Sequence, residues 1–495
     1  MRHVLSVKDF SSDWVREVLG GAETMMSLLG GAARSRGFVQ PFAKCTLAFF
    51  EPSTRTSGSF GEAARLLDFA CHSISGAEAT SLAKDESIAN TVRMLGKGNQ
   101  GADILVMRTK LEGAPRFAAE ILAEMDYATA VLSGGDGTNE HPTQALLDWV
   151  TIKRSLGRTG DLVLGVVGDL EMSRVAHSDL GLARLMGVRQ VRLSSAPEVR
   201  VQPKYKRGFE EIKEGDSLDL LADCDVVIVL RVQSERYTDK LKLARAKSFF
   251  RVTRKVLDSW KKNVIVLHPL PCVDEIDPAI YYDPRILMYR QAELAIPTRM
   301  YLCVQSYKSR RENHSPPPYR LACLQIIREA SVDQHLAARR REYQYFRPIR
   351  DGVILDHIPA GRGIAIRRLL RGVEDSAIIH LIEGVPSQRF GRKDVLVLEH
   401  YSPSEHFLGA VAFLWPEASF NILRDGMHRK ARIDLSQATV GIMPCPNPYC
   451  ITNHDPEAKT RTRFSIVRDE KEEFLAECGY CEREFTRDEI RAVFS

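Results

Sequence analysis

The feature that most constrains this 495-residue chain is a repeated pattern of short apolar runs that each end in polar or basic residues. Apolar, β-prone runs of about four to eight residues indicate buried strands. The runs cover residues 46–50, 102–107, 162–167, 225–230 and 264–267. Ligands of open α/β sheets bind outside the carboxyl ends of the strands. We therefore predict an α/β protein whose strand ends share a ligand site.

The first of these strand ends carries the stretch Ser53-Thr54-Arg55-Thr56, directly after Pro52. Proline followed by serine or threonine is a helix-start signal. Three hydroxyl groups and one guanidinium would then meet the free N–H groups of a helix N-terminus, and all of these groups favour an anion such as phosphate. Ordinary N-capping is the alternative for an isolated Ser-Thr pair.

Further polar residues follow this stretch in a fixed order. They are Ser81 and Lys84 in a polar loop, Arg108 after a strand, His141 and Gln144 at a helix start, Arg174, Arg231 and Gln233 after later strands, and Pro269 and Leu270 in the sequence His-Pro-Leu-Pro. A single arginine is more often an ordinary surface residue. Arginines that recur at successive strand ends instead favour an anionic ligand, because guanidinium groups pair with carboxylates and phosphates.

Two close cysteine pairs in the last third of the chain have the spacing of a zinc site. Cys445 and Cys450 form a C-x4-C pair, and Cys478 and Cys481 form a C-x2-C pair. Together the pairs offer four thiolates to tetrahedral Zn²⁺. Disulfides and buried free thiols are the alternatives. Disulfides are the weaker one, because the chain has only ten cysteines and no secretory signal.

Composition and charge argue against several classes of function. The chain is 44% hydrophobic and 27% charged, as globular proteins are. No apolar run approaches the about 18 residues of a membrane span, and residues 1–20 do not resemble a signal peptide. A net charge of +5 suits anionic substrates but is too small to indicate nucleic-acid binding. We expect a cytoplasmic protein that binds neither membrane nor nucleic acid.

The motifs STRT, SxxK, MR, HPTQ, RVQ and HPLP occur together and in this order. With them, roughly the first three hundred residues resemble the catalytic chain of aspartate carbamoyltransferase. The resemblance implies two doubly wound parallel-sheet domains of the carbamoyltransferase fold. It also implies transfer of the carbamoyl group of carbamoyl phosphate to L-aspartate, without a catalytic cofactor, in pyrimidine synthesis.

The resemblance assigns a role to each motif residue. Carbamoyl phosphate would contact Ser53, Thr54, Arg55, Thr56, Ser81, Lys84, Arg108, His141, Gln144, Pro269 and Leu270. Of these, Arg55, Thr56, Arg108 and His141 would act in catalysis, and aspartate would bind Lys84, Arg174, Arg231 and Gln233. Ser81 and Lys84 would come from a neighbouring subunit, so that active sites are complete only in a homotrimer.

From Phe346 onward the chain resembles the bacterial regulatory chain of this family, which in the best-known members is a separate polypeptide. The sequence DGVILDHIPA at 351–360, the sequence GRKD at 391–394 and the cysteine spacing carry this resemblance. It implies ATP and CTP as effectors, with Asp356, His357, Lys393 and Asn421 at the nucleotide pocket. It also implies a structural zinc domain that docks onto catalytic trimers. A lone trimer and a hexamer joined through regulatory-domain dimers both remain open.

Several residues depart from the family pattern. Val397 stands where a lysine that contacts the nucleotide is usual, and Gly426 stands where an aromatic residue is usual. We therefore predict weak, altered or absent control by nucleotides. Asp85 replaces a glycine after the loop lysine, and Cys272 replaces an arginine after HPLP. These two changes bear on turnover and aspartate affinity, but not on the reaction class.

Two other functions are alternatives. The first is another carbamoyltransferase, such as one acting on ornithine, although those enzymes typically carry HCLP in place of HPLP. The second is a scaffold without catalysis that binds nucleotide or nucleic acid through its zinc ribbon. The complete catalytic series disfavours the scaffold.

The predicted domains follow the motifs. They are a carbamoyl-phosphate domain at 1–140 with a returning helix at about 295–308, an aspartate domain at 141–294, a linker at 309–345, a small regulatory α/β sandwich at 346–439 and a β-rich zinc domain at 440–495. The apolar residues Leu321, Leu324, Ile327, Val332 and Leu336 indicate one helix within the linker.

Overall fold

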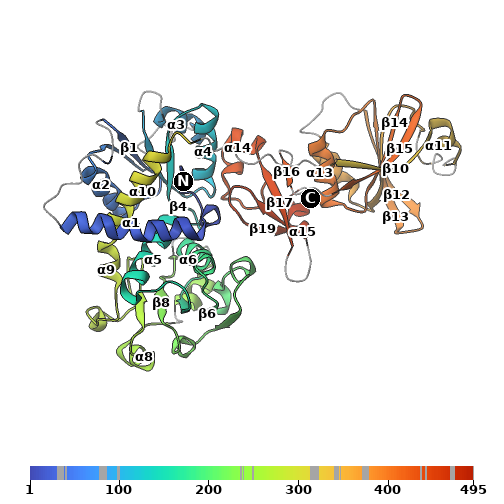
Figure 1. Cartoon of the computed structure of the whole chain (residues 1–495). Helices are drawn as coiled ribbons and strands as arrows, with labels where there is room; N and C mark the ends of the chain where they lie inside the picture. The colour runs from blue at the N-terminus through green and yellow to red at the C-terminus, as the bar shows by residue number, and fades with distance from the viewer. Residues whose placement is uncertain are drawn as a thin grey trace. The chain divides into compact units, whose positions relative to one another are not determined.

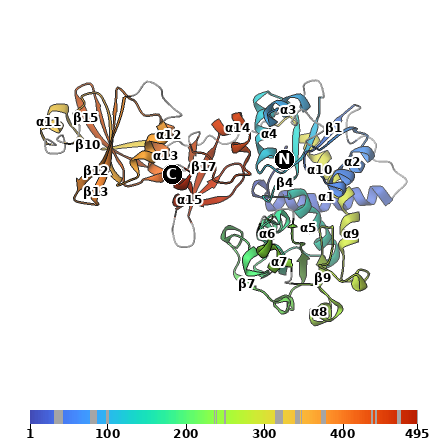
Figure 2. The same cartoon turned by 180° about the vertical axis from the view of Figure 1, so that it is seen from behind.

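A computed structural model of the chain divides into two compact units, Met1–Ser315 and Pro316–Ser495. Figures 1 and 2 show both units from opposite sides. The residues that the structure describes are 1–30, 38, 42–76, 86–96, 101–234, 237, 239–247, 250–312, 323–338, 345, 347–370, 378–434, 438–440, 443–468 and 474–493. Among these residues, no helix combines the length and the apolar character that a membrane crossing requires.

The first unit begins with a four-stranded parallel sheet in the order β2-β1-β3-β4. Its elements are α1 (Ser12–Gly30), β1 (Lys44–Phe49), α2 (Thr54–Leu66), β2 (Ala70–Ser75), α3 (Ile88–Leu95), β3 (Ile104–Thr109), α4 (Ala114–Glu124) and β4 (Ala130–Asp136). Ile104 and Val106 of β3 join a core with α1 and α2, whereas α4 also packs on β3. Because side chains alternate along a strand, helices cover both faces of this sheet.

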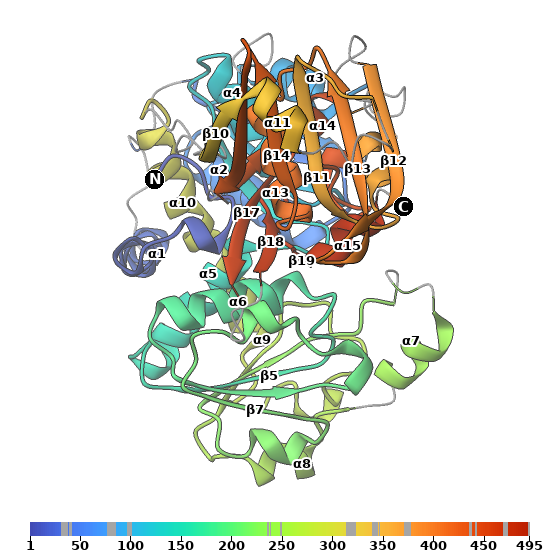
Figure 3. The same ribbon diagram turned by 90° about the vertical axis from the view of Figure 1, so that its right-hand side faces the viewer.

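A second parallel sheet has five strands in the order β7-β6-β5-β8-β9. Its elements are α5 (Pro142–Leu156), β5 (Val163–Val167), α6 (Arg174–Leu185), β6 (Gln190–Ser194), β7 (Glu211–Gly215), β8 (Val226–Val229), α7 (Lys240–Lys247), α8 (Arg254–Ser259), β9 (Ile265–Leu267) and α9 (Met288–Glu293). Figure 3 shows α6 and α8 on opposite sides of the strands.

Strand β8 shows why this sheet is doubly wound. Val226 and Ile228 pack into the core that contains α6, whereas Val227 and Val229 pack into a separate core that contains Leu257 of α8. A parallel strand that is buried on both faces has to be continuously apolar, as this one is. The predicted fold class of two doubly wound parallel sheets is confirmed.

The helix expected after Ala295 is α10 (Ala295–Ser309), which packs against α1, α2 and α5. The chain therefore leaves the second sheet and returns to the helices of the first. This return places the end of β1, the start of α5 and the start of α10 around one cavity.

The second unit contains a six-stranded antiparallel sheet in the order β10-β15-β14-β11-β13-β12. Its elements are β10 (Cys323–Ser331), α11 (Val332–Ala338), β11 (Gly352–Pro359), α12 (Gly363–Leu370), β12 (Ile378–Ser387), β13 (Gly391–Glu399), α13 (Glu405–Leu414), β14 (Ser419–Arg424) and β15 (Met427–Asp434). Helix α12 packs on β12 and β13, and α13 packs on β10 and β15. These contacts form the expected small α/β layer structure.

The prediction of a helix across Leu321 to Leu336 is wrong for residues 323–331. These residues form the edge strand β10, which pairs antiparallel with β15, and only 332–338 are helical. The spacing of apolar residues suited a helix. Pairing with a strand about a hundred residues later decided otherwise, because tertiary contacts override local propensity. Part of the predicted linker thus belongs to the six-stranded sheet.

The C-terminal part contains a four-stranded antiparallel sheet in the order β16-β17-β18-β19, as expected for a β-rich domain. Its elements are β16 (Ala438–Val440), α14 (Pro456–Thr460), β17 (Arg463–Arg468), β18 (Phe474–Cys478), β19 (Glu484–Thr486) and α15 (Arg487–Ala492). Helix α13 packs on β16 and α15, and Arg491 donates 2.8 Å from Nε to the Leu414 carbonyl. The six-stranded sheet and the cysteine-bearing sheet therefore share packing through α13.

We predict that Gly352 is irreplaceable in the second unit. Its φ is +131°, and a Cβ there would lie 2.1 Å from the Leu398 carbonyl oxygen. Gly352→Ala should lower the free energy of unfolding by about 3 kcal/mol or more, from backbone strain plus a backbone clash. Gly391→Ala is the matched control, because Gly391 has a φ of +70° and open space around its Cβ. It should lose only about 1 kcal/mol. Equal losses in calorimetric unfolding would contradict the clash.

Candidate active site and metal site

The N-terminus of α2 lies directly after strand β1, and the residues of the STRT motif form its first turn. Ser53 is the N-cap residue with extended backbone, and its side chain makes no capping hydrogen bond. The first turn holds no acidic residue. The first N–H groups of any helix lack intrahelical acceptors, and the helix dipole is positive there. This turn can therefore accept an anion.

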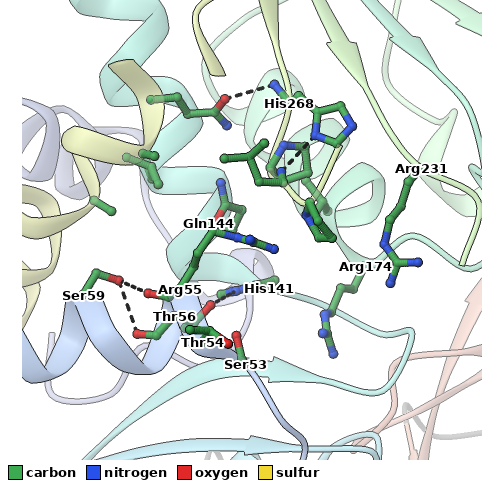
Figure 4. Close-up of a pocket in the computed structure, with 18 of the residues that line it drawn as sticks. Ser53, Thr54, Arg55, Thr56, Ser59, His141, Gln144, Arg174, Arg231 and His268 are labelled. Carbon is green, nitrogen blue, oxygen red and sulfur yellow. Dashed lines mark hydrogen bonds between the residues drawn. The ribbon is translucent and has the colours of Figure 1, made fainter. Parts of the chain in front are cut away.

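The α2 N-terminus opens into a cavity of about 440 Å³ at the carboxyl ends of both parallel sheets. The sequence-predicted residues that line it are Ser53, Thr54, Arg55, Thr56, Arg108, His141, Gln144, Arg174, Arg231, Gln233, Pro269 and Leu270. Figure 4 shows the STRT residues and His141 close together on one side of the cavity, Arg174 and Arg231 on another, and Gln144 between the STRT residues and His268. Ser81, Lys84 and Asp85 lie outside the described residues.

His141 is buried at the start of α5 between two hydroxyl groups. Its Nε2 lies 3.4 Å from the Thr56 hydroxyl and its Nδ1 lies 3.4 Å from the Thr143 hydroxyl. Burial lowers the pKa of His141 well below its usual value, and the nearby Arg108, Arg174 and Arg299 lower it further. The imidazole is therefore neutral at neutral pH, and it can donate one hydrogen bond without adding another positive charge.

Glu51 is the acidic side chain that balances the arginines. Its Oε2 lies 2.9 Å from Arg174 Nη1 and 3.4 Å from Arg108 Nε. Arg174 also donates to the Gly137 carbonyl at 3.0 Å, and Arg108 donates to the Gly134 carbonyl at 2.9 Å. These contacts hold both guanidinium groups in place at the cavity wall.

Two further cations face the same space. Burial and the charge of Arg231 lower the pKa of Arg55. Burial lowers the pKa of Arg299 to about 10, and its guanidinium lies 4.9 Å from the centre of the Phe60 ring. Both groups stay charged at neutral pH, and an anionic ligand would relieve the repulsion between Arg55 and Arg231.

The His-Pro-Leu-Pro loop closes another side of the cavity. The Leu270–Pro271 peptide bond is cis, and Leu270 has a φ of +58°. The Leu270 N–H donates to His268 Nδ1 at 2.9 Å, and the His268 N–H donates to Gln291 Oε1 at 3.0 Å. The loop is thereby tied to α9. Cys272 follows it, half-buried, 3.6 Å from the Tyr281 hydroxyl.

The cavity-lining residues to which sequence reasoning gave no site role include Glu51, His268, Gln291 and Arg299. Glu51 and His268 stand next to or within quoted motifs, so their positions offered a signal. Gln291 and Arg299 lie in α9 and α10, far along the sequence, and only the return of the chain brings them here.

The predicted nucleotide residues lie together on the central strands of the six-stranded sheet. Lys393 Nζ contacts Asp356 Oδ1 at 2.7 Å, and both side chains are buried. The His357 Nδ1 lies 3.1 Å from the Ser419 hydroxyl. The buried Asn421 donates to the Ile354 carbonyl at 3.3 Å and contacts His428 Nε2 at 3.1 Å. Each of these side chains therefore already has a polar partner within the sheet.

The two positions that depart from the family pattern lie elsewhere in this sheet. Val397 packs into a core cluster with Ile354 and Leu423. Gly426 occupies the turn between β14 and β15 with open space around its Cβ position. Neither position offers a cation or an aromatic ring near the Asp356–Lys393 pair.

The four predicted metal ligands Cys445, Cys450, Cys478 and Cys481 form one buried cluster. Two sulfur pairs are 3.7 and 3.9 Å apart. Thiolates about 2.3 Å from a tetrahedral ion lie about 3.8 Å apart, whereas a disulfide bond is only about 2.05 Å long. The Thr452 hydroxyl donates to Cys450 Sγ at 3.2 Å. The cluster fits a structural metal ion with no coordination position left open for water.

Four family models match the chain. Residues 2–154 match the carbamoyl-P binding domain of aspartate/ornithine carbamoyltransferase, and residues 161–305 match its Asp/Orn binding domain. Residues 345–433 match the allosteric domain of the aspartate carbamoyltransferase regulatory chain, and residues 437–491 match its metal binding domain.

Individual relatives agree with these matches. The aspartate carbamoyltransferase catalytic subunit of Hyperthermus butylicus is 37% identical over 310 residues, which are 61% of this chain and 94% of that protein. The M. jannaschii catalytic subunit aligns with a TM-score of 0.56 at 32% identity, over 63% of this chain and all of that one. A Trypanosoma cruzi aspartate transcarbamoylase in complex with carbamoyl phosphate aligns with a TM-score of 0.56 at 26% identity, over 61% of this chain and 95% of that one.

The two parallel sheets and the arginine-lined cavity between them define a carbamoyltransferase-type catalytic unit. The chain belongs to the aspartate carbamoyltransferase family, and it joins catalytic domains to regulatory and metal-binding domains in one polypeptide.

Replacing one cysteine of the cluster should remove the metal. Cys478→Ser leaves three thiolates, so elemental analysis should find far less than one ion per chain, and the second unit should melt at a lower temperature. Cys224→Ser is the matched control, because Cys224 is also a buried thiol but lies in the first unit. Equal metal content in Cys478→Ser and the unmodified chain would argue against the site.

Proposed function

We propose that the chain transfers the carbamoyl group of carbamoyl phosphate to the amino group of L-aspartate, giving N-carbamoyl-L-aspartate and phosphate in pyrimidine synthesis. The observation that carries the proposal is the cavity, where five guanidinium groups and a neutral histidine converge beside an open helix N-terminus. Such a site suits two anionic substrates that react without a covalent intermediate, since positioning and electrostatic stabilisation suffice.

The family resemblance suggests the residue roles, and the position of these residues in one cavity supports them. Ser53, Thr54, Arg55 and Thr56 hold the phosphate with the α2 N–H groups. Thr56, Arg108 and His141 donate to the carbonyl oxygen as negative charge develops on it during amine attack. Gln144 and the carbonyls near Pro269 and Leu270 bind the carbamoyl amide. The leaving phosphate remains held by Arg55.

The positive charge of the cavity indicates which amino acid accepts the carbamoyl group. Arg174 and Arg231, with Gln233, would hold the two carboxylates of aspartate, because guanidinium groups pair with carboxylates through two parallel hydrogen bonds. The side chain of ornithine is a cation and would be repelled by the same groups. This charge pattern favours aspartate over the ornithine alternative, and the catalytic cavity favours an enzyme over a scaffold.

The assembly and the metal complete the proposal. Ser81 and Lys84 would reach the active site of a neighbouring copy in a homotrimer, and regulatory domains could pair two trimers into a hexamer.

The metal would be zinc, because four thiolates in tetrahedral arrangement suit Zn²⁺. Its role here would be structural. We place the enzyme in the cytoplasm.

Loss of Arg55 tests the catalytic assignment. Arg55→Ala should reduce carbamoyl-aspartate formation by at least ~10²-fold, because it removes one preorganised charge from the phosphate subsite. Arg65→Ala is the matched control on the same helix, since Arg65 is exposed, pairs with Glu62 at 2.8 Å and does not line the cavity. It should stay near full activity. Product formed from ornithine rather than aspartate, or full activity of Arg55→Ala, would contradict the proposal.

Nucleotide control should be weak. The positive charge of Lys393 is already neutralised by the buried Asp356. ATP and CTP should therefore shift the half-saturating aspartate concentration by less than about fivefold, below the usual range of allosteric coupling. Lys393→Met should leave this response unchanged but lower stability, because it strands a buried carboxylate. A strong response that Lys393→Met abolishes would show that the pocket is functional.

A further inference from the structure

A pair of buried carboxyl groups lies directly behind the catalytic cavity. Asp148 is on α5, one turn after Gln144, and Asp179 is on the neighbouring helix α6. Both residues are fully buried, and the two carboxyl groups lie within hydrogen-bonding reach of each other. Neither appears in the sequence motifs or in the residue roles proposed above.

Asp148 is tied to the cavity through one oxygen atom. Its Oδ1 accepts from Gln144 Nε2 at 2.8 Å and from Gln291 Nε2. Gln291 in turn accepts from the His268 N–H, and His268 accepts from the Leu270 N–H. One carboxyl oxygen therefore anchors both Gln144 and the His-Pro-Leu-Pro loop.

The remaining carboxyl oxygens have no donor. Among the described residues, neither Asp148 Oδ2 nor either oxygen of Asp179 has a hydrogen-bond donor. Two adjacent carboxylates in a buried site cannot both be ionised without a large cost, and a proton between them would satisfy these oxygens.

The charges around the pair support a single negative charge. The ionisable side chains that face it are the two carboxyl groups themselves, from α5 and α6, and Arg299 from α10, while α9 contributes the neutral amide of Gln291. One proton on the pair leaves one negative charge opposite one guanidinium. Burial raises the pKa of both carboxyl groups, and the charge of Asp148 raises the pKa of Asp179 further.

We propose that Asp148 and Asp179 share one proton and that this pair positions the side-chain amides of Gln144 and Gln291. The shared proton keeps Asp148 Oδ1 a hydrogen-bond acceptor, so both amides turn their NH₂ groups toward it. Gln144 must turn its NH₂ group toward Asp148, which leaves its carbonyl oxygen for the cavity that it lines. A carbonyl oxygen is the group that accepts from a carbamoyl NH₂. This inference rests on the proposed carbamoyl-transfer function.

The shared proton has a consequence for stability. A folded-state pKa above the unfolded value means that the folded chain retains a proton that the unfolded chain releases. Stability should therefore fall as pH rises from the ordinary carboxyl range through the raised pKa of the pair. Asp179→Asn and Asp148→Asn each supply an N–H in place of the proton, so each should flatten this dependence without breaking the network.

The experiment compares these two variants with Asp148→Leu and with Asp225→Asn. Asp225 is a buried aspartate of the same unit that contacts Val163 N–H and Lys261 and does not line the cavity. The first readout is the thermal unfolding midpoint as a function of pH, which needs no activity. We expect the alkaline loss of stability in the unmodified chain and in Asp225→Asn, but not in Asp179→Asn.

The second readout is carbamoyl phosphate binding, by calorimetry and by its KM. Asp148→Leu frees the Gln144 amide to reverse, so affinity should fall by about tenfold or more. Asp148→Asn should restore the affinity to within about threefold.

An unchanged pH profile of stability in Asp179→Asn would overturn the shared proton. Unchanged affinity in a folded Asp148→Leu would overturn the positioning role. Absence of carbamoyl transfer in the unmodified chain would refute the function, while the stability profile would still decide the pair.

Discussion

The convergence of five guanidinium groups in one cavity is the constraint on which the catalytic unit depends. Arg55, Arg108, Arg174, Arg231 and Arg299 line one cavity. Glu51 neutralises part of this charge, and the Gly134 and Gly137 carbonyls accept from two of the groups. Asp148 faces Arg299 with a negative charge, and an anionic ligand can pair with the positive charge that remains. Burial, and then the charges of the nearby arginines, keep His141 neutral, so the histidine can act as a hydrogen-bond donor beside the cations.

In the second unit, in contrast, buried charged and metal-binding side chains are paired with one another. Lys393 and Asp356 satisfy each other inside the six-stranded sheet, and the four cysteines form a closed cluster suited to a metal ion. Partners that are already paired leave little charge for an added ligand. The catalytic cavity, in contrast, is lined among the described residues by five arginines and by one carboxylate, that of Glu51.

Much of this architecture was predictable from local pattern. The strand ends at Arg108 and Arg231, the helix start at Ser53 and the cysteine spacing all correspond to the structure, because each depends on residues close in sequence. The helix predicted through Ile327 was wrong, since β10 forms by pairing with β15. Arg299, Gln291 and the Asp148–Asp179 pair were missed for a related reason. Nothing local marks a residue whose partners lie on other helices.

The sequence by itself determined the α/β class, the order of the anion-binding residues and the four-cysteine set, because strand periodicity, helix-start signals and ligand spacing are properties of short segments. Only the tertiary structure decided which of those residues share a cavity and what balances their charge. The cavity residues come together only because the chain returns to the first sheet through α10. The ion pairs Glu51–Arg174 and Asp356–Lys393 depend on distances between strands and helices, and the spacing of residues along the sequence does not encode these distances.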